Sequence, residues 1–268
     1  MDKPDRHASI SFDRAADIYD DTRGFPAGVS EQVAAATSSF LAHSKRVLEI
    51  GIGTGRISIP LTAGGVPMFG IDLSSRMLSR LRQNLPAGVS SPYLVLADAC
   101  HLPFSDSSLD AVMAVHVFHL ISNPETALDE IQRVLVDGGS LYLGYDEHDT
   151  DTPISRIREH WRDITLAYRE TAGLPKRWEF SDVEERVAVN GLHLRGKILA
   201  ASWEREINVP TYLERLQGGY FSATWNMPEP VLRRLIDELR SWILAEYGTL
   251  ELICTEKDQF IWIHYQVP

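Results

Sequence analysis

The stretch Val47-Leu48-Glu49-Ile50-Gly51-Ile52-Gly53-Thr54-Gly55 decides the fold class of this chain. It begins with an apolar run that is typical of a buried strand, and three glycines follow at alternate positions. Glycine allows a positive φ and a close approach of the backbone to a ligand at a strand-to-helix turn. Helical spacing resumes at residues 56–61. A strand, a glycine-rich turn and a helix in this order predict one repeat of a parallel α/β sheet.

The same alternation of short apolar runs and helical periods continues through residues 45–144. Beyond it, residues 194–207 and 259–266 are strand-like, and helical segments are expected at about 147–180 and 208–247. We therefore predict an α/β fold: a doubly wound, Rossmann-like, mostly parallel seven-stranded sheet with an inserted helical cap. The first five strands are expected at 46–50, 67–71, 93–96, 111–115 and 140–143.

Two of the expected helices carry start or stop signals. Asn123-Pro124 supplies a cap and a first helical residue, and Gly138-Gly139 is expected to stop that helix. The helix expected over residues 181–190 opens with a capping box in which Ser181 faces Glu184.

Composition excludes several classes of protein. The formal net charge is −11 and no run of lysine and arginine occurs, so a nucleic-acid partner is not expected. The two cysteines, Cys100 and Cys254, lie far apart, which argues against a disulfide framework or a structural zinc site. The first residues are too polar for a signal peptide, and the most apolar stretch, 109–121, is too short to span a bilayer. We therefore expect a cytoplasmic protein with no membrane partner.

Acidic residues follow the first three predicted strands. Glu49 precedes the glycine turn, Asp72 closes the second strand and Asp98 closes the third. An acid at the end of the second strand can accept both hydroxyls of a ribose. A carboxylate beside the turn would repel a pyrophosphate but favour a ligand with a sulfonium and an ammonium. The acids therefore favour S-adenosylmethionine over NAD, although the glycines alone would also fit a purely structural turn.

Four stretches together resemble the motifs of class I S-adenosylmethionine-dependent methyltransferases. They are Val47 to Gly55, Gly70-Ile71-Asp72-Leu73-Ser74 with Met77-Leu78, Ala97-Asp98-Ala99 with Leu102-Pro103-Phe104, and Ser108-Leu109-Asp110-Ala111-Val112. Residues 12–20, Phe-Asp-Arg-Ala-Ala-Asp-Ile-Tyr-Asp, are similar to the leader of the ubiquinone/menaquinone-type, small-molecule branch. One departure is Asp137, where relatives often have proline before the paired glycines.

The resemblance implies a role for each matching residue. Gly51 and Gly53 would pass beside the amino-acid end of S-adenosylmethionine, and Asp72 would hold its ribose. Asp98 and Ala99 would bind the adenine. The full set of expected cofactor-binding residues is Tyr19, Glu49, Gly51, Gly53, Asp72, Leu73, Met77, Asp98, Ala99 and His116, with Tyr19 closing over the cofactor and His116 near its methionyl part.

The chain is expected to have three parts. Residues 1–40 would form an N-terminal helical lid, and residues 41–146 the Rossmann-like cofactor-binding core. Residues 147–268 would supply substrate cap helices and the last two strands. All six tryptophans lie beyond residue 150, which favours an aromatic-lined pocket there, although packing of cap helices explains most of them equally well.

Residues at the exits of the fourth and fifth strands are candidates for the chemistry. We favour His119 and Asp146 as catalytic residues over His116, Tyr145 and His148, because strand ends in this fold face the ligand crevice. A packed or capping role for His119 remains an alternative. The spacing of His116 and His119 would place both imidazoles on one helical face, but no added cysteine or glutamate supports a metal site, and none is predicted.

Trp225 and Tyr145 are the expected substrate contacts. Arg156, Arg158 and Arg162 are alternative candidates that would recognise an anionic group.

The predicted function is in-line methyl transfer from S-adenosylmethionine to a small molecule, by a monomer or a homodimer. The acceptor atom, whether oxygen, nitrogen, carbon or sulfur, is left open by the residues. One alternative is a non-catalytic S-adenosylmethionine-binding regulatory or partner protein. The other is an NAD-dependent oxidoreductase.

Overall fold

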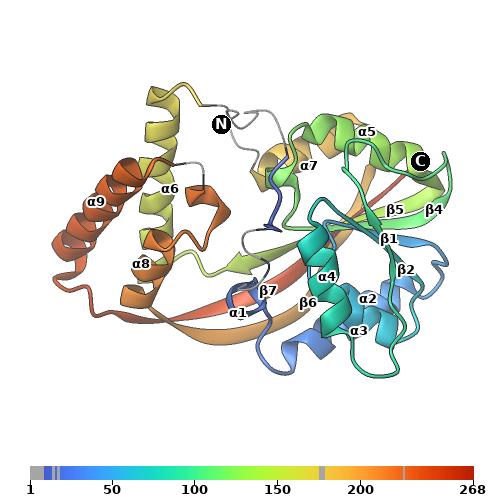
Figure 1. Ribbon diagram of the computed structural model, residues 1–268, viewed down its shortest axis with the longest axis horizontal. Helices are drawn as coiled ribbons and strands as arrows, with labels where there is room; N and C mark the ends of the chain where they lie inside the picture. The colour runs from blue at the N-terminus through green and yellow to red at the C-terminus, as the bar shows by residue number, and fades with distance from the viewer. Residues whose placement is uncertain (1–8, 14–15, 17–18, 175–178, 226) are drawn as a thin grey trace. The chain divides into compact units, whose positions relative to one another are not determined.

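The computed structural model describes residues 9–13, 16, 19–174, 179–225 and 227–268 (Figure 1). Parts of two predicted segments, the lid at 1–40 and the leader at 12–20, lie outside the described residues. Contacts divide the chain into two compact units. The first unit comprises Met1–Asp146, Trp178–Ala201 and Phe260–Pro268, and the second comprises Glu147–Arg177 and Ser202–Gln259.

A seven-stranded sheet organises the chain, with the strand order β3-β2-β1-β4-β5-β7-β6. The four pairings that join β3, β2, β1, β4 and β5 are parallel. In their register, Glu49 lies opposite Gly70 on one side and Met113 on the other. The strands are β1 Val47–Ile50, β2 Met68–Asp72, β3 Tyr93–Leu96, β4 Leu109–Val115, β5 Leu135–His148, β6 His193–Asn208 and β7 Ile253–Gln266.

Strand β7 runs against its neighbour β5. The Ser140 hydroxyl lies 3.0 Å from Nε2 of His264, whereas Gly144, later in β5, lies against Trp262, earlier in β7. A pairing that moves forward along one strand and backward along the other is antiparallel. The predicted mostly parallel seven-stranded sheet is therefore confirmed.

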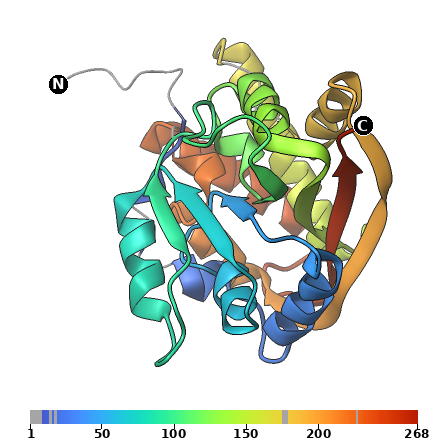
Figure 2. The ribbon, with the colours of Figure 1, turned by 90° about the vertical axis from the view of Figure 1, so that its right-hand side faces the viewer.

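Helices cover both faces of the sheet in the first unit (Figure 2). On one face lie α2, α3 and α4. Phe40 of α2 stacks on Tyr142 of β5 with ring centroids 4.3 Å apart, and the Trp262 indole donates to Thr37 Oγ1 at 3.0 Å. On the other face, α5 and α7 pack on the largest core cluster. The helices of this unit are α1 Tyr19–Arg23, α2 Val29–Leu41, α3 Ser58–Ala63, α4 Ser75–Asn84, η2 Phe118–Leu120, α5 Pro124–Val134 and α7 Phe180–Val189.

The start of α5 is as predicted, but its end is not. Asn123 Oδ1 accepts a hydrogen bond from the main-chain nitrogen of Thr126 at 3.2 Å, and Pro124 is the first helical residue. The helix ends at Val134 and β5 begins at the next residue, so Gly138-Gly139 lies inside the strand. The expectation that these glycines stop the helix was wrong, because they are held beside the end of β7: the nitrogen of Val267 donates to the oxygen of Gly139 at 2.9 Å, and the Gln266 side chain donates to the oxygen of Gly138 at 2.8 Å.

The capping box of α7 was also misplaced. The helix begins at Phe180, one residue before the predicted start, so the cap is Glu179 rather than Ser181. The side chain of Asp182 accepts from the Glu179 nitrogen at 2.8 Å, which fills the position predicted for Glu184.

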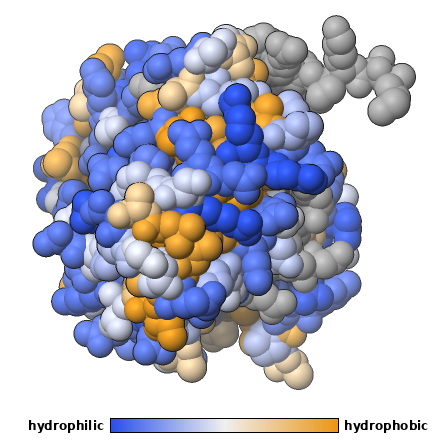
Figure 3. Space-filling model, turned by 90° about the vertical axis from the view of Figure 1, so that its left-hand side faces the viewer, coloured by the Kyte–Doolittle hydropathy of each residue, from blue (hydrophilic) through white to orange (hydrophobic). Residues whose placement is uncertain are grey.

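The second unit contains the helices that follow β5 and β6. Its core packs Trp161 of α6 with Leu213 of α8 and with Leu239 and Ile243 of α9. The side that carries α6 and α9 is largely hydrophilic, with separate hydrophobic patches (Figure 3). Across the described residues, no helix combines the length and the apolarity needed to cross a membrane. The helices are α6 Pro153–Thr171, α8 Val209–Gln217, η3 Ser222–Thr224 and α9 Glu229–Tyr247.

Candidate functional site

The glycine turn after β1 meets the segment that leaves β4. Gly51 and Gly53 have φ values of +67° and +56°, in the left-handed region that glycine adopts readily. A Cβ added to Gly51 would lie 2.6 Å from Cγ2 of Val117. The turn therefore lies too close to the β4 exit for a residue larger than glycine at position 51.

Asp72, the last residue of β2, connects the glycine turn to the next helix. Its Oδ2 accepts from the nitrogen of Gly53 at 2.9 Å, and its Oδ1 accepts from that of Ser74 at 2.8 Å. Burial raises the pKa of Asp72, and these two hydrogen bonds oppose the shift. A carboxylate offers about four acceptor sites, so the two bonds leave capacity for the hydroxyls of a ribose.

Glu49 lies buried at the end of β1, with 3% of its surface exposed. Burial raises its pKa to about 8, and the Asp72 charge acts in the same direction, while Arg56 and Ser58 oppose the shift. Among the described residues, its Oε2 has no hydrogen-bond partner. Glu49 is therefore mostly protonated at neutral pH, which refines the expectation of a carboxylate beside the turn. A cationic ligand would favour loss of that proton.

Asp98 lies two residues beyond the end of β3 at Leu96. The bounds 93–96 predicted for the third strand are confirmed, and the β2–β3 pairing ends at Asp72 and Leu96. The nitrogen of Ala97 donates to the oxygen of Asp72 at 3.2 Å, and Asp98 Oδ1 accepts from the nitrogen of Cys100 at 2.9 Å. The other predicted residues of this edge differ in exposure: Ala99 and Met77 are buried, whereas Leu73 is 38% exposed.

The N-terminal segment lies on the same loops. Asp20 of α1 accepts from Thr54 Oγ1 at 2.5 Å and from the Asn84 amide at 2.9 Å. Asp13 accepts from Ser74 Oγ at 2.5 Å. Tyr19 is close enough to the acids for both Glu49 and Asp72 to raise its pKa slightly, although burial is the main cause of the increase.

Asp13 and Asp20 are site residues that the sequence analysis missed. Both belong to the stretch 12–20 that resembles a family leader, so the signal was present. Their partners are 34 and 61 residues away in the chain, and spacing alone does not reveal such pairs.

The two histidines beyond β4 do not share a helical face. His116 has a φ of +49°, and the short η2 helix includes His119 but begins only at Phe118. The expected alignment of both imidazoles was wrong, because the left-handed backbone at His116 redirects the chain before the helix starts. His116 Nε2 instead lies 3.1 Å from Oδ2 of Asp146, and His119 is half-buried.

Tyr145 and Asp146 are adjacent in β5, so their side chains point to opposite faces of the sheet. Lys197 Nζ donates to the Tyr145 hydroxyl at 3.2 Å, from the strand β6. Lys197 was not predicted, because it is 52 residues from Tyr145 in the chain. The structure thus separates these two predicted residues, one beside Lys197 and the other beside His116.

In the second unit, the remaining candidates have structural contacts. The Trp225 indole donates to the oxygen of Gly219 at 2.7 Å, within the turn that follows α8. The three arginines proposed for anion recognition are all ion-paired. The pairs are Arg156 with Glu246 at 2.7 Å, Arg158 with Glu256 at 2.7 Å and Arg162 with Glu159 at 3.5 Å.

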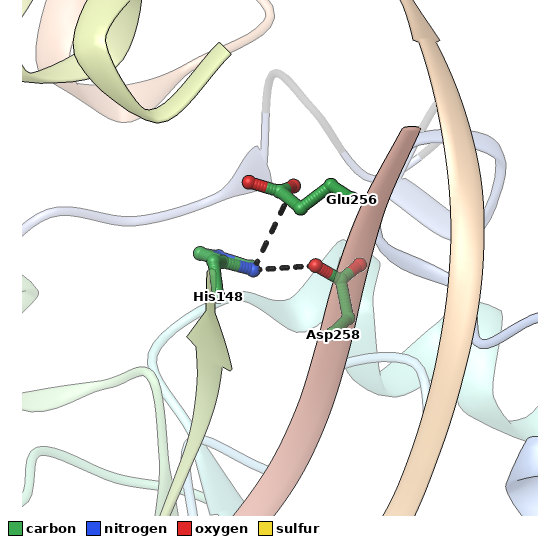
Figure 4. A group of neighbouring side chains, drawn as sticks. All are labelled: His148, Glu256 and Asp258. Atoms are coloured by element: carbon green, nitrogen blue, oxygen red, sulfur yellow. Dashed lines mark hydrogen bonds and ion pairs between the residues drawn. The ribbon is translucent and has the colours of Figure 1, made fainter. Parts of the chain in front are cut away.

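His148, Glu256 and Asp258 form a compact group of possible metal ligands (Figure 4). Their donor atoms lie within 4.8 Å of one another, and His148 Nδ1 is 2.7 Å from Asp258 Oδ1. Both carboxylates are fully buried and already paired with guanidinium groups. Arg158 Nη1 contacts both oxygens of Glu256, at 2.7 and 2.9 Å, and Arg205 Nε lies 2.5 Å from Asp258. Two acids and two arginines balance in charge, so the arrangement is an ion-pair network in which a cation would compete with arginine.

Known proteins are similar to the part of the chain that contains the glycine turn. A family model described as a methyltransferase domain matches residues 48–143. The demethylmenaquinone methyltransferase of Clavibacter sepedonicus is 34% identical over 146 residues, 53% of this chain and 59% of that protein. The malonyl-[acyl-carrier protein] O-methyltransferase of Methylococcus capsulatus is 27% identical over 234 residues, covering 85% and 82% of the two chains.

The fold also matches solved structures. A S-adenosylmethionine-dependent methyltransferase from Thermotoga maritima superposes with a TM-score of 0.52 at 18% identity, covering 96% of this chain and 98% of that one. Several curated relatives are matched over little more than half of their length. The matched residues include the glycine turn, Asp72 and Asp98. Residues 48–143 thus match a methyltransferase domain.

Proposed function

We propose that this protein transfers a methyl group from S-adenosylmethionine to a small-molecule acceptor. The observation that carries the proposal is the pair of acids at the glycine turn. Asp72 is held by the turn itself through Gly53, and Glu49 lies beside it with a buried oxygen that accepts no hydrogen bond among the described residues. A buried acid of this kind suits the ammonium of an amino acid.

Each acid would contact a different part of the donor. Asp72 would accept hydrogen bonds from the ribose hydroxyls, Asp98 would accept one from the adenine amino group, and Glu49 would pair with the ammonium. Tyr19 would cover the cofactor from the N-terminal segment. S-adenosylmethionine supplies a methyl carbon that its sulfonium has already activated, so the protein contributes mainly position and alignment.

The small-molecule acceptor is supported by the relatives and by charge. One relative is named for demethylmenaquinone and another for a malonyl group on its carrier protein. The formal net charge of −11 does not favour a polyanionic substrate. Residues 147–268 are proposed to bind the acceptor, with Trp225 as a contact, and the protein to act as a monomer or a homodimer. Tyr145 is not retained as a contact, because its side chain lies on the opposite face of the sheet from Asp146.

Binding and transfer can be tested in sequence. Native mass spectrometry with S-adenosylmethionine, S-adenosylhomocysteine and NAD should show complexes with the first two. A radiolabelled methyl donor and an acceptor panel then test turnover. A complex with NAD alone would favour the oxidoreductase alternative. Binding of S-adenosylmethionine without transfer to any acceptor would favour a regulatory protein.

A further inference from the structure

A histidine and an aspartate meet at the exits of β4 and β5, inside the first unit. His116 directly follows β4, and its Nε2 lies 3.1 Å from Oδ2 of Asp146 near the end of β5. Both side chains are partly exposed, the imidazole at 36% and the carboxylate at 22%. The pair is therefore positioned by the sheet and accessible to a ligand at its edge.

The local backbone also marks this position. His116 is one of two described non-glycine residues with a positive φ. The left-handed conformation costs roughly 1–2 kcal/mol for a residue with a side chain, and such strain gathers at functional sites. The next residue, Val117, contacts Gly51 of the cofactor turn. His116 is thus adjacent in the chain to a residue that lies beside the loop proposed to hold the methyl donor.

The hydrogen bond determines which ring nitrogen is available. A carboxylate only accepts, so the neutral imidazole must carry its proton on Nε2 to pair with Asp146. Nδ1 is then left with a lone pair. An imidazole oriented by a carboxylate, with a bare nitrogen at a ligand site, is the arrangement of a general base.

Other groups at this edge are less suited to the role. Of the titratable groups at the ends of the strands flanking β4, Glu49 is buried and Tyr145 points to the other face. The second unit has its own histidine–aspartate pair, His148 with Asp258, but that aspartate is also bound to Arg205. An arginine on the carboxylate weakens its ability to stabilise an imidazolium.

We propose that His116, oriented by Asp146, removes the proton of the methyl acceptor, and that the acceptor is a hydroxyl or an amine. This rests on the proposed methyl transfer. The acceptor oxygen or nitrogen attacks the methyl carbon as the carbon–sulfur bond breaks, and sulfur keeps that electron pair as a neutral thioether. The proton of the acceptor passes to Nδ1, and Asp146 stabilises the resulting imidazolium. A carboxylate acceptor has no proton to lose and would not need this base.

The tautomer can be measured without knowing the acceptor. In protein labelled with ¹⁵N-histidine, two-bond ¹H–¹⁵N spectra should show His116 with its proton on Nε2, assigned by its loss in His116→Gln. Asp146→Asn can donate to Nε2, and it should shift the proton to Nδ1. A proton on Nδ1 in the wild type, or no change in Asp146→Asn, would overturn the proposal.

Turnover tests the acceptor class with three probes, catechol, phenethylamine and octanoate, and a radiolabelled methyl donor. We expect label on catechol or phenethylamine. His116→Gln should lower kcat by about 10²–10⁴-fold and remove the acidic limb of the pH profile of kcat/KM. Asp146→Glu should recover part of the rate. His43→Asn, an exposed histidine at the end of α2, should keep the full rate.

The outcomes separate this proposal from the function on which it rests. An unchanged kcat in His116→Gln, or label on octanoate alone, would overturn the base while leaving methyl transfer intact. Failure of S-adenosylmethionine to bind the wild type in calorimetry would overturn the function instead. If the wild type labels none of the three probes, the tautomer measurement decides the state of His116.

Discussion

The main-chain nitrogen of Gly53 donates a hydrogen bond of 2.9 Å to Oδ2 of Asp72. This bond joins the turn after β1 to the last residue of β2, so one carboxylate both shapes the glycine turn and faces the proposed ribose site. If Asp72 binds the ribose as proposed, the shape of the turn and the recognition of the ligand depend on the same side chain.

Asp72→Ala should weaken S-adenosylmethionine binding by about 10- to 100-fold, because hydrogen bonds to a charged group contribute about 1.5–3 kcal/mol. Asp72→Asn keeps one acceptor oxygen and should lose less. Isothermal titration calorimetry measures both. Asp137→Ala, an exposed acid near the start of β5, is the matched control and should bind normally. An affinity within twofold of wild type in Asp72→Ala would contradict the assignment.

Binding of S-adenosylmethionine should depend on pH through Glu49. The pKa of Glu49 is about 8 in the free protein, and pairing with an ammonium needs the ionised form. Affinity should therefore rise with pH by up to tenfold per unit below about 8, with a proton released from Glu49 on binding, until the amino group of the ligand begins to lose its own proton. Calorimetry in buffers of different ionisation enthalpy counts that proton.

Glu49→Gln is the control for this titration, because the ligand has an amino group that also titrates in this range. The difference between wild type and Glu49→Gln isolates the Glu49 contribution. Identical proton release in the two proteins would show that Glu49 keeps its proton in the complex.

Gly51→Ala should destabilise the protein for two separable reasons. A left-handed φ costs roughly 1–2 kcal/mol for alanine, and the new Cβ would lie 2.6 Å from Val117. Gly65 also has a positive φ, +87°, but no atom lies within 4 Å of a Cβ added there. Gly65→Ala should therefore show the backbone cost alone. Adding Val117→Ala to Gly51→Ala should recover the steric part. Urea unfolding of the four proteins measures each term, and equal losses for Gly51→Ala and Gly65→Ala would exclude the clash.

Arg158→Met should destabilise the second unit by about 2–3 kcal/mol, because it leaves the fully buried Glu256 with a weaker partner. Arg205 remains 3.4 Å from Glu256, which keeps the loss below that of an isolated buried pair. Arg162→Met, whose partner Glu159 is exposed, should change stability by less than about 0.5 kcal/mol. Thermal unfolding by circular dichroism distinguishes the two. A double variant with Glu256→Gln should regain stability if the buried charge causes the loss.

Most of the sheet was predictable because its signals are local. The apolar run before Gly51 and the Asn123-Pro124 cap are read from a few neighbouring residues, and both are observed in the structure. The extents of β5 and β7 were not predictable in this way. Both strands are longer than their apolar cores, since each is extended by pairing with residues more than 100 positions away.

The candidate site was also predictable only where its signals are local. Strand ends placed Glu49 and Asp72 beside the glycine turn, because parallel strands bring their carboxyl ends to one edge. The pairing of His116 with Asp146 depends on a left-handed backbone at one histidine, which no spacing rule indicates. The pKa of Glu49 depends on burial by surrounding elements, a property of the assembled fold.

The second unit is built from two separate segments, Glu147–Arg177 and Ser202–Gln259, so the chain passes between the units four times. The second unit therefore cannot be removed or exchanged as one continuous segment of the chain. Ending the chain after the first segment would also delete β7, an interior strand of the sheet. Under the proposal that residues 147–268 bind the acceptor, new acceptor preferences would arise by substitution within the two segments, and an engineered chimera would have to graft both at once.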